Sequence, residues 1–216
     1  MSIDKILSKV EKAAKKAGRN KDDVKVIAIS KVQPLERIKR VLNRGHRIFG
    51  ENRIQDSLNK WPSLIEKYGK IELHLVGALQ TNKVKEAVRF FNVIHSIDRE
   101  KLVFKLEVEA QKLGSCPELF IQVNTGNELQ KAGVSLENLE DLFSLAKERY
   151  SLPVVGLMCL PPIEDSPLIH FEKLSRLNKG LGLSRISMGM SSDFEDAIQA
   201  GSTDVRIGSA LFGPRG

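Results

Sequence analysis

A lysine that directly follows a short apolar run is the first residue in this sequence with clear chemical potential. Lys31 comes after VKVIAIS, which predicts a buried strand over residues 24–30. A partly desolvated amine has a lowered pKa, and its neutral form attacks carbonyl carbons to give a Schiff base. A single lysine of this kind is more often an ordinary residue that opens a loop, so its interpretation depends on its neighbours.

Small and hydroxylated residues follow the last two predicted strands. Ser191 and Ser192 are expected to open a helix, in which Ser192 and Glu195 form a capping box. Gly208 and Ser209 supply further backbone N–H groups on a small-residue turn. Loops at these two positions commonly bind a phosphate in barrel proteins. Two capped helices without a ligand are the alternative, but capping does not explain why the Gly-Ser pair falls at the same place.

Arg206 lies near the end of the last predicted strand. An arginine that points into a site requires an acceptor or an anion. Beside a pyridine ring its guanidinium would keep the ring nitrogen unprotonated, which makes the ring a weaker electron sink. An ion pair with Glu51 is the alternative. Together, the lysine, the phosphate-binding turns and the arginine describe a site for pyridoxal phosphate.

These residues must be positioned by the elements between them, and those elements alternate. Short β-branched runs recur, each followed by a segment of helical period. Eight such units predict a (β/α)8 barrel, in which the strand ends would form one functional rim. A doubly wound open sheet is the runner-up. The strand candidates are 24–30, 47–49, 72–76, 92–95, 118–123, 154–158, 185–188 and 204–207.

The helix candidates carry recognisable signals. An extra helix precedes the first strand and places Ile3, Ile6, Leu7 and Val10 on one face. Another runs over 99–113, with Asp98 able to cap its start. Further apolar stripes continue the pattern along the chain. The fold prediction is therefore one barrel domain over residues 1–216 with an additional N-terminal helix.

Three other side chains at the predicted strands are weaker candidates. His74 and His95 lie within strands, where a packed histidine is more common than a base. Cys159 follows the sixth strand and could be a reactive thiol, but buried cysteines are usually inert. No spacing typical of a metal site is present.

Composition restricts the class of protein. The chain has 216 residues, of which 41% are hydrophobic and 28% charged, as in ordinary globular proteins. We expect no membrane span, no signal peptide and no disulfide framework, hence a cytoplasmic location. The net charge is +7, but the basic residues are dispersed and only 6% are aromatic, which argues against nucleic acid and fits a small anionic ligand.

The sequence resembles the YggS/PROSC family of pyridoxal-phosphate-binding proteins, whose barrel is similar to the N-terminal domain of alanine racemase. The resemblance runs almost end to end. Its motifs are AISKVQP (28–34), FGENRIQD (49–56), HLVGALQTNK (74–83), SIDR (96–99), GLM (156–158) and SMGMSSDFEDAIQAGSTDVRIGSALFG (187–213).

The resemblance implies a role for each candidate residue. Lys31 would carry the cofactor as a Schiff base, and Arg206 would approach the pyridine nitrogen. Asn52 would line the pocket. The phosphate would be held by Ser191, Gly208 and Ser209.

The resemblance also implies a carrier of pyridoxal phosphate in vitamin B6 homeostasis, which would pass the cofactor to apo-enzymes. Alanine racemases draw their second base from an additional C-terminal domain, and this chain ends at Gly216. We therefore expect a monomer without efficient amino-acid turnover. The alternatives are a slow racemase-like enzyme, a lysine-dependent aldolase acting on a phosphorylated sugar and, more remotely, a nucleic-acid binder.

Overall fold

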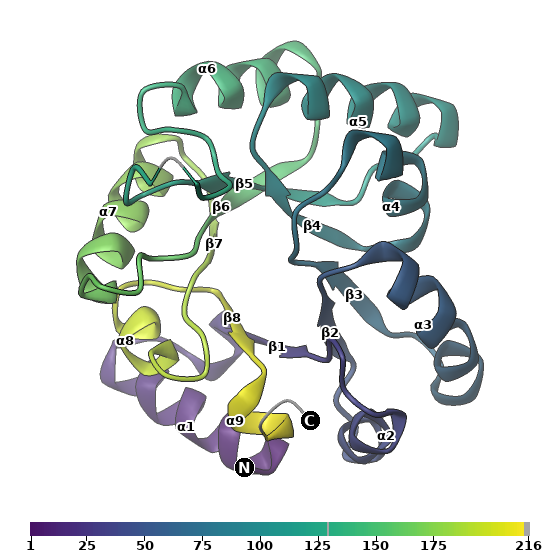
Figure 1. The fold of residues 1–216 in the computed structure, drawn as a ribbon. Coiled ribbons are helices and arrows are strands. Elements are labelled where there is room, and N and C mark those ends of the chain that lie inside the picture. Colours follow the sequence, from purple (N-terminus) through teal and green to yellow (C-terminus); the bar gives the residue numbers. More distant parts are fainter. Residues whose placement is uncertain (129, 214–216) are drawn as a thin grey trace.

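The computed structural model of the chain describes residues 1–128 and 130–213, which form a closed barrel of parallel strands inside a ring of helices (Figure 1). Each strand pairs with the next in the chain, and β8 pairs with β1. The strands are β1 (Lys25–Ile29), β2 (Ile48–Glu51), β3 (Glu72–Leu75), β4 (Val93–Ile97), β5 (Glu118–Val123), β6 (Val154–Cys159), β7 (Arg185–Ser187) and β8 (Asp204–Ile207).

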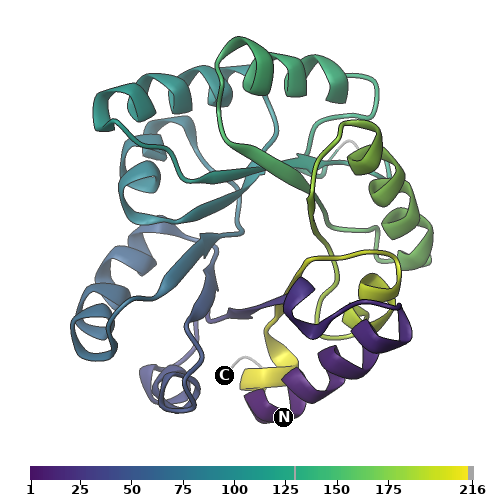
Figure 2. The ribbon, with the colours of Figure 1, turned by 180° about the vertical axis from the view of Figure 1, so that it is seen from behind.

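Helices connect successive strands along the outside of the barrel (Figures 1 and 2). The helix α6 continues into a π-helical turn over Leu145–Arg149. The helices are α1 (Ile3–Lys16), α2 (Leu35–Asn43), α3 (Ile54–Tyr68), α4 (Val84–Phe90), α5 (Glu100–Leu113), α6 (Leu139–Ser144), α7 (Pro167–Gly180), α8 (Phe194–Gln199) and α9 (Ser209–Phe212).

The pairing of β8 with β1 decides between the two predicted architectures. Val26 lies opposite Val205, and Ala28 lies opposite Ile207, so the sheet has no open edge at this point. The (β/α)8 barrel is confirmed, and the doubly wound open sheet is wrong. Because all strands are parallel, their carboxyl ends meet at one rim.

The extra N-terminal helix is confirmed as α1, which packs beside α8 on the outside of the barrel (Figure 2). Its buried face consists of Ile3, Ile6, Val10, Ala13 and Ala14. Leu7 is 44% exposed, so its predicted place on the apolar face is wrong. The residues that pack recur three and four positions apart, and Leu7 falls at the edge of that stripe.

Two predicted helix caps are also wrong. The helix after β7 begins at Phe194, and Ser192 and Glu195 form no capping box. Instead, the carboxylate of Asp193 accepts a hydrogen bond from the backbone N–H of Met190, and Glu195 pairs with Lys9 of α1 at 2.7 Å. Glu195, which the sequence predicts as a capping residue, therefore forms an ion pair with Lys9, a residue far away in the chain.

The second concerns α5, which begins at Glu100 without a side-chain cap from Asp98. Asp98 pairs with Arg99 instead, at 2.5 Å. The predicted end is confirmed, because Gly114 ends this helix in the left-handed conformation.

Strand boundaries differ from the predictions by at most two residues, and those of β5 and β8 agree at both ends. The largest functional consequence is in β2, which continues to Glu51 rather than ending at Phe49. Glu51 therefore lies within the sheet, where alternate side chains face opposite sides. No helix in the described part of the chain is long and apolar enough to cross a membrane.

Candidate functional site

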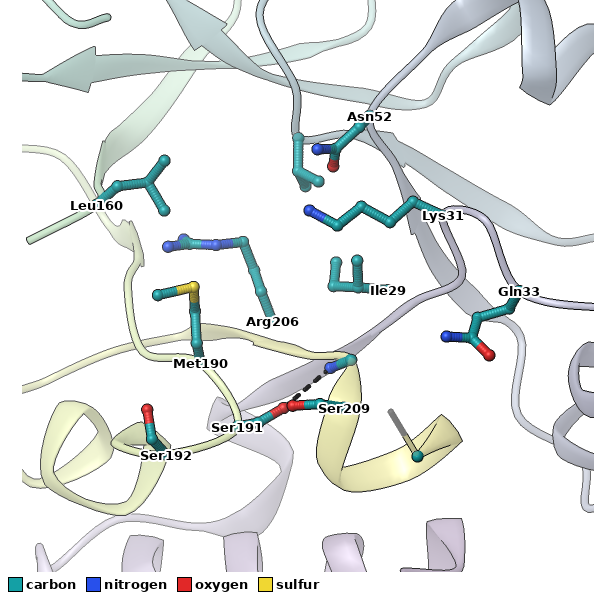
Figure 3. A pocket seen from close by; sticks show the side chains of 13 residues that line it. Ile29, Lys31, Gln33, Asn52, Leu160, Met190, Ser191, Ser192, Arg206 and Ser209 are labelled. Atoms are coloured by element: carbon teal, nitrogen blue, oxygen red, sulfur yellow. Dashed lines mark hydrogen bonds between the residues drawn. The ribbon is translucent and has the colours of Figure 1, made fainter. Parts of the chain in front are cut away.

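A cavity of about 350 Å³ opens at the carboxyl ends of the strands (Figure 3). A volume of this size is typical of small-molecule sites. Apolar side chains, among them Ile29, Val76, Leu160 and Met190, form part of its wall. All six residues nominated from the sequence line it, namely Lys31, Asn52, Ser191, Arg206, Gly208 and Ser209.

Lys31 enters the cavity from the end of β1. Ile29, the last residue of β1, and Lys31 both line the cavity, whereas Ser30 between them does not. The side chain of Lys31 extends across the mouth of the cavity, and its amine points toward the side chain of Arg206 (Figure 3). The amine is therefore presented to the cavity.

Arg206 of β8 is a buried cation at the floor of this cavity, only 4% exposed. It donates hydrogen bonds to Oγ of Ser187 at 2.6 Å and to the carbonyl oxygen of Cys159 at 2.8 Å, and both acceptors are neutral. Burial lowers the pKa of the Arg206 guanidinium. A buried positive charge normally requires a hydrogen-bond acceptor or an anion. The cavity is therefore suited to a ligand that brings such a group to Arg206.

The ion pair between Arg206 and Glu51 considered from the sequence is wrong. The carboxylate of Glu51 accepts instead from Lys60, Ser30 and Trp61. Within the described ranges, no carboxylate forms a salt bridge with Arg206, and no Asp or Glu lines the cavity. The electrostatic character of the site is therefore cationic.

A chain of polar side chains continues from Arg206 down through the interior of the barrel. Ser187, which accepts from Arg206, lies 2.9 Å from Nδ1 of His95. Nε2 of His95 lies 2.8 Å from Nδ1 of His74, whose Nε2 contacts Oε1 of Glu72 at 2.9 Å. The hydrogen bond from His74 is the main reason that the pKa of Glu72 is lowered to about 2.

Both histidines are fully buried, in agreement with their prediction as packed residues. The ring of His95 stacks on Phe120 with their centroids 4.4 Å apart. Burial lowers the pKa of His95 well below its usual value, and the charges of His74, Arg206 and Arg185 lower it further. His95 is therefore a neutral ring that positions Ser187 behind the guanidinium.

The loops after β7 and β8 meet at the side of the cavity near Ser191. The hydroxyl oxygen of Ser191 accepts from the backbone N–H groups of Gly208 and Ala210, both at 3.2 Å. The hydroxyl of Ser209 lies close by in Figure 3, whereas Ser192 points away. This corner gathers two serine hydroxyls beside the small-residue turn after β8, where the N–H groups of Gly208 and Ala210 already turn toward an oxygen acceptor. Hydroxyls and backbone N–H groups are the usual ligands of a phosphate.

Asn52 reaches the cavity from the end of β2, with its amide directed inward (Figure 3). Gly77 lies directly behind it, and a Cβ at Gly77 would come within 2.2 Å of the carbonyl oxygen of Asn52. The backbone that carries Asn52 thus needs a glycine as its neighbour.

Cys159 is not a reactive thiol. Its side chain is fully buried, and burial raises the pKa of the thiol to about 12. The thiolate, which is the nucleophilic form, is therefore scarce near neutral pH. The residue contributes its backbone carbonyl to Arg206 instead.

Several contributing residues were missed from the sequence. Leu160 and Met190 are each 39% exposed at the mouth and line the cavity. Their positions in the loops after β6 and β7 are the signal that could have identified them. Ser187 and His95 support Arg206, but their contact joins strands 92 residues apart and leaves no local pattern.

Comparisons place this chain among known proteins over its whole length. A family described as alanine racemase, N-terminal domain, matches residues 1–216. The pyridoxal phosphate homeostasis protein of Aquifex aeolicus (strain VF5) is 40% identical, and the match covers 99% of this chain and 96% of that protein. The protein of the same name from Vibrio cholerae serotype O1 is 37% identical, with coverage of 99% and 95%.

A solved structure is similar as well. PipY of Synechococcus elongatus PCC7942, determined with PLP bound, has a TM-score of 0.82 and 31% sequence identity to this chain. The match covers 95% of this chain and 100% of that one. The same barrel therefore occurs in a protein whose structure contains PLP.

The lowered pKa of His95 predicts a pH dependence of stability. The unfolded chain binds a proton at this histidine near pH 6.5, whereas the folded protein does not, so stability is full above that pH and falls as the pH is lowered. His95→Gln removes this titration. Between pH 6 and pH 5 the stability of the wild type should fall more steeply than that of the variant, with a limit of about 1.4 kcal/mol per pH unit for one linked proton.

Urea unfolding at a series of pH values measures this difference. Parallel curves for the wild type and His95→Gln over that interval would contradict a neutral His95.

Proposed function

The chain belongs to the alanine racemase N-terminal domain family, and from this premise we propose that it binds pyridoxal phosphate covalently through Lys31 and acts as a carrier of that cofactor. When bound, pyridoxal phosphate supplies an aldehyde that links reversibly to amines and a ring that withdraws electrons. The observation that carries the proposal is the buried guanidinium of Arg206, without a carboxylate partner in the described ranges, beside the amine of Lys31 on one cavity.

The donor set of the cavity fits the cofactor group by group. The neutral amine of Lys31 would condense with the aldehyde carbon, so that a carbon–nitrogen double bond forms and water leaves. Arg206 would donate to the pyridine nitrogen, and as a permanent cation it would leave that nitrogen unprotonated. The apolar wall that includes Ile29 and Val76 would contact the ring.

The phosphate would lie in the corner formed by Ser191, Gly208 and Ser209. Hydroxyls and backbone N–H groups converge there, and the cavity carries no acidic side chain within the described ranges that would repel an anion. Asn52 would contact the cofactor from the opposite wall. Arg206 adds a fixed positive charge, which favours a doubly charged phosphate over a neutral ligand.

A carrier role fits the chemistry of Arg206 better than efficient amino-acid turnover. A pyridine that stays unprotonated withdraws electrons less strongly than a pyridinium, so it stabilises a carbanion less. The relatives named pyridoxal phosphate homeostasis protein support a role in cofactor supply. Retention and release of the cofactor, with apo-enzymes as its recipients, are therefore the function that we assign.

Attachment at Lys31 is tested by substitution. We expect wild-type protein mixed with equimolar pyridoxal phosphate and reduced with borohydride to gain one cofactor mass per chain, and Lys31→Ala to gain none. Lys83→Ala is the matched control, because Lys83 is a half-exposed lysine paired with Glu86, and it should behave as wild type. Intact-mass spectrometry reads the result. An adduct that survives in Lys31→Ala and is lost in Lys83→Ala would overturn the assignment.

The distinction between carrier and enzyme is tested with alanine in deuterated water. We expect cofactor-loaded protein to exchange the α-hydrogen of L-alanine no faster than the same concentration of free pyridoxal phosphate, because no strong electron sink is formed. Proton NMR and chiral chromatography follow exchange and racemisation. Exchange well above the free-cofactor rate, lost in Lys31→Ala, would establish the slow racemase-like alternative instead.

A further inference from the structure

The turn that carries Lys31 has a strained backbone. The N–H of Gln33 donates to the carbonyl oxygen of Ser30 at 3.2 Å, which closes a four-residue turn with Lys31 and Val32 at its centre. Val32 has φ of +50°, so the turn has the sign pattern of type II, which normally places glycine or asparagine at that position. Val32 is β-branched and 68% exposed, so burial of its side chain does little to offset the strain.

Ser30, the first residue of this turn, is hydrogen-bonded to both members of a buried ion pair, Glu51 and Lys60. Oε1 of Glu51 accepts from Oγ of Ser30 at 2.6 Å and from Nζ of Lys60 at 2.8 Å. Nζ of Lys60 also donates to the carbonyl oxygen of Ser30 at 2.9 Å. Ser30 is thus held by its side chain and its backbone at once, in a closed ring of three residues that we call the Ser30 clamp.

The Ser30 clamp lies behind the cavity and not in it. Ile29 and Lys31 line the cavity, whereas Ser30, between them in the chain, does not line it and donates to Glu51. Likewise Glu51 faces the layer between the barrel and α3, where Trp61 donates to it at 3.1 Å. Glu51 is 1% exposed, and the side chain of Lys60 is 13% exposed. The clamp residues are therefore not in contact with a ligand of the cavity.

A buried ion pair is poor evidence for stability, because removing two charges from water offsets much of their attraction. A strained backbone conformation, in turn, persists only where several surrounding contacts hold it in place. The Ser30 clamp supplies such contacts, since it fixes the carbonyl oxygen of Ser30 that accepts the hydrogen bond of the turn. It is adjacent in the chain to the one lysine that lines the cavity within the described ranges.

We propose that Glu51 and Lys60 are positioning residues, whose grip on Ser30 holds the strained Lys31–Val32 turn so that the amine of Lys31 is presented to the cavity. This inference rests on the proposed function, in which Lys31 is the attachment point. Without the clamp, the turn relaxes away from positive φ at Val32, and the amine leaves its place near Arg206.

The test combines loss of the clamp with relief of the strain. Lys60→Met keeps the aliphatic stem and removes the amine, and Glu51→Gln keeps the volume and removes the charge. We expect each to slow adduct formation with pyridoxal phosphate on the order of tenfold, the effect of a displaced reactive group. Adding Val32→Gly to Lys60→Met should restore most of the rate, because glycine adopts positive φ without strain. Val32→Ala, which keeps a Cβ, should restore little.

Lys67→Met on the same helix is the matched control, because Lys67 is exposed and outside the clamp. A wild-type rate in both Lys60→Met and Glu51→Gln would overturn the proposal. The proposal would also be overturned if Lys60→Met forms the adduct slowly and the added Val32→Gly does not restore the rate, although the unfolding midpoint of the double variant matches the wild type. If Lys60→Met does not fold, Glu51→Gln with and without Val32→Gly decides in the same way.

A second readout does not require the cofactor. Competitive reductive methylation of the cofactor-free protein with formaldehyde, read by peptide mass spectrometry, compares Lys31 with exposed Lys67. We expect the relative rate at Lys31 to move toward that of Lys67 in Lys60→Met and to return with Val32→Gly; an unchanged ratio would overturn the proposal. If wild-type protein forms no adduct with pyridoxal phosphate, the proposed function fails, while this comparison still decides the role of the clamp.

Discussion

The buried guanidinium of Arg206 is the constraint around which the mouth of the barrel is organised. It is 4% exposed, donates only to the neutral oxygens of Ser187 and Cys159, and has no carboxylate partner within the described ranges. Such a cation is further stabilised where a ligand in the cavity supplies an additional acceptor or an anion. The cationic cavity, the inward Lys31 and the hydroxyl-rich corner at Ser191 all suit a ligand that combines an acceptor ring, a carbonyl group and a phosphate.

Arg206 and Lys31 are each supported by a polar network whose residues lie outside the cavity. Arg206 rests on Ser187, which is followed by His95, His74 and Glu72 through the barrel interior. Lys31 rests on the Ser30 clamp, in the layer between the barrel and α3. Each support places polar groups in a buried environment, where partly satisfied contacts are costly and satisfied ones fix geometry. The barrel thus orients the side chains of Lys31 and Arg206 through two separate polar networks.

Much of this could be predicted from the sequence, for a physical reason. Parallel strands of a barrel bring their carboxyl ends to one rim, so residues that follow each apolar run share a site whatever the details of packing. That rule was enough to collect Lys31, Asn52 and Arg206. It could not give the partner of Glu51, because a shift of the β2 boundary by two residues decides which face the carboxylate takes. Nor could it reveal that Lys9 takes Glu195 away from a helix cap, since that pair joins residues 186 positions apart.

The most direct test of the central claim is a crystal structure of this chain with pyridoxal phosphate bound. We predict electron density continuous from Nζ of Lys31 to the cofactor, the pyridine nitrogen within hydrogen-bonding distance of Arg206, and the phosphate in the corner of Ser191, Gly208 and Ser209. Cofactor attached to another lysine, or bound at Lys31 with its ring nitrogen directed away from Arg206, would contradict the assignment of the buried guanidinium as the group that the ligand completes.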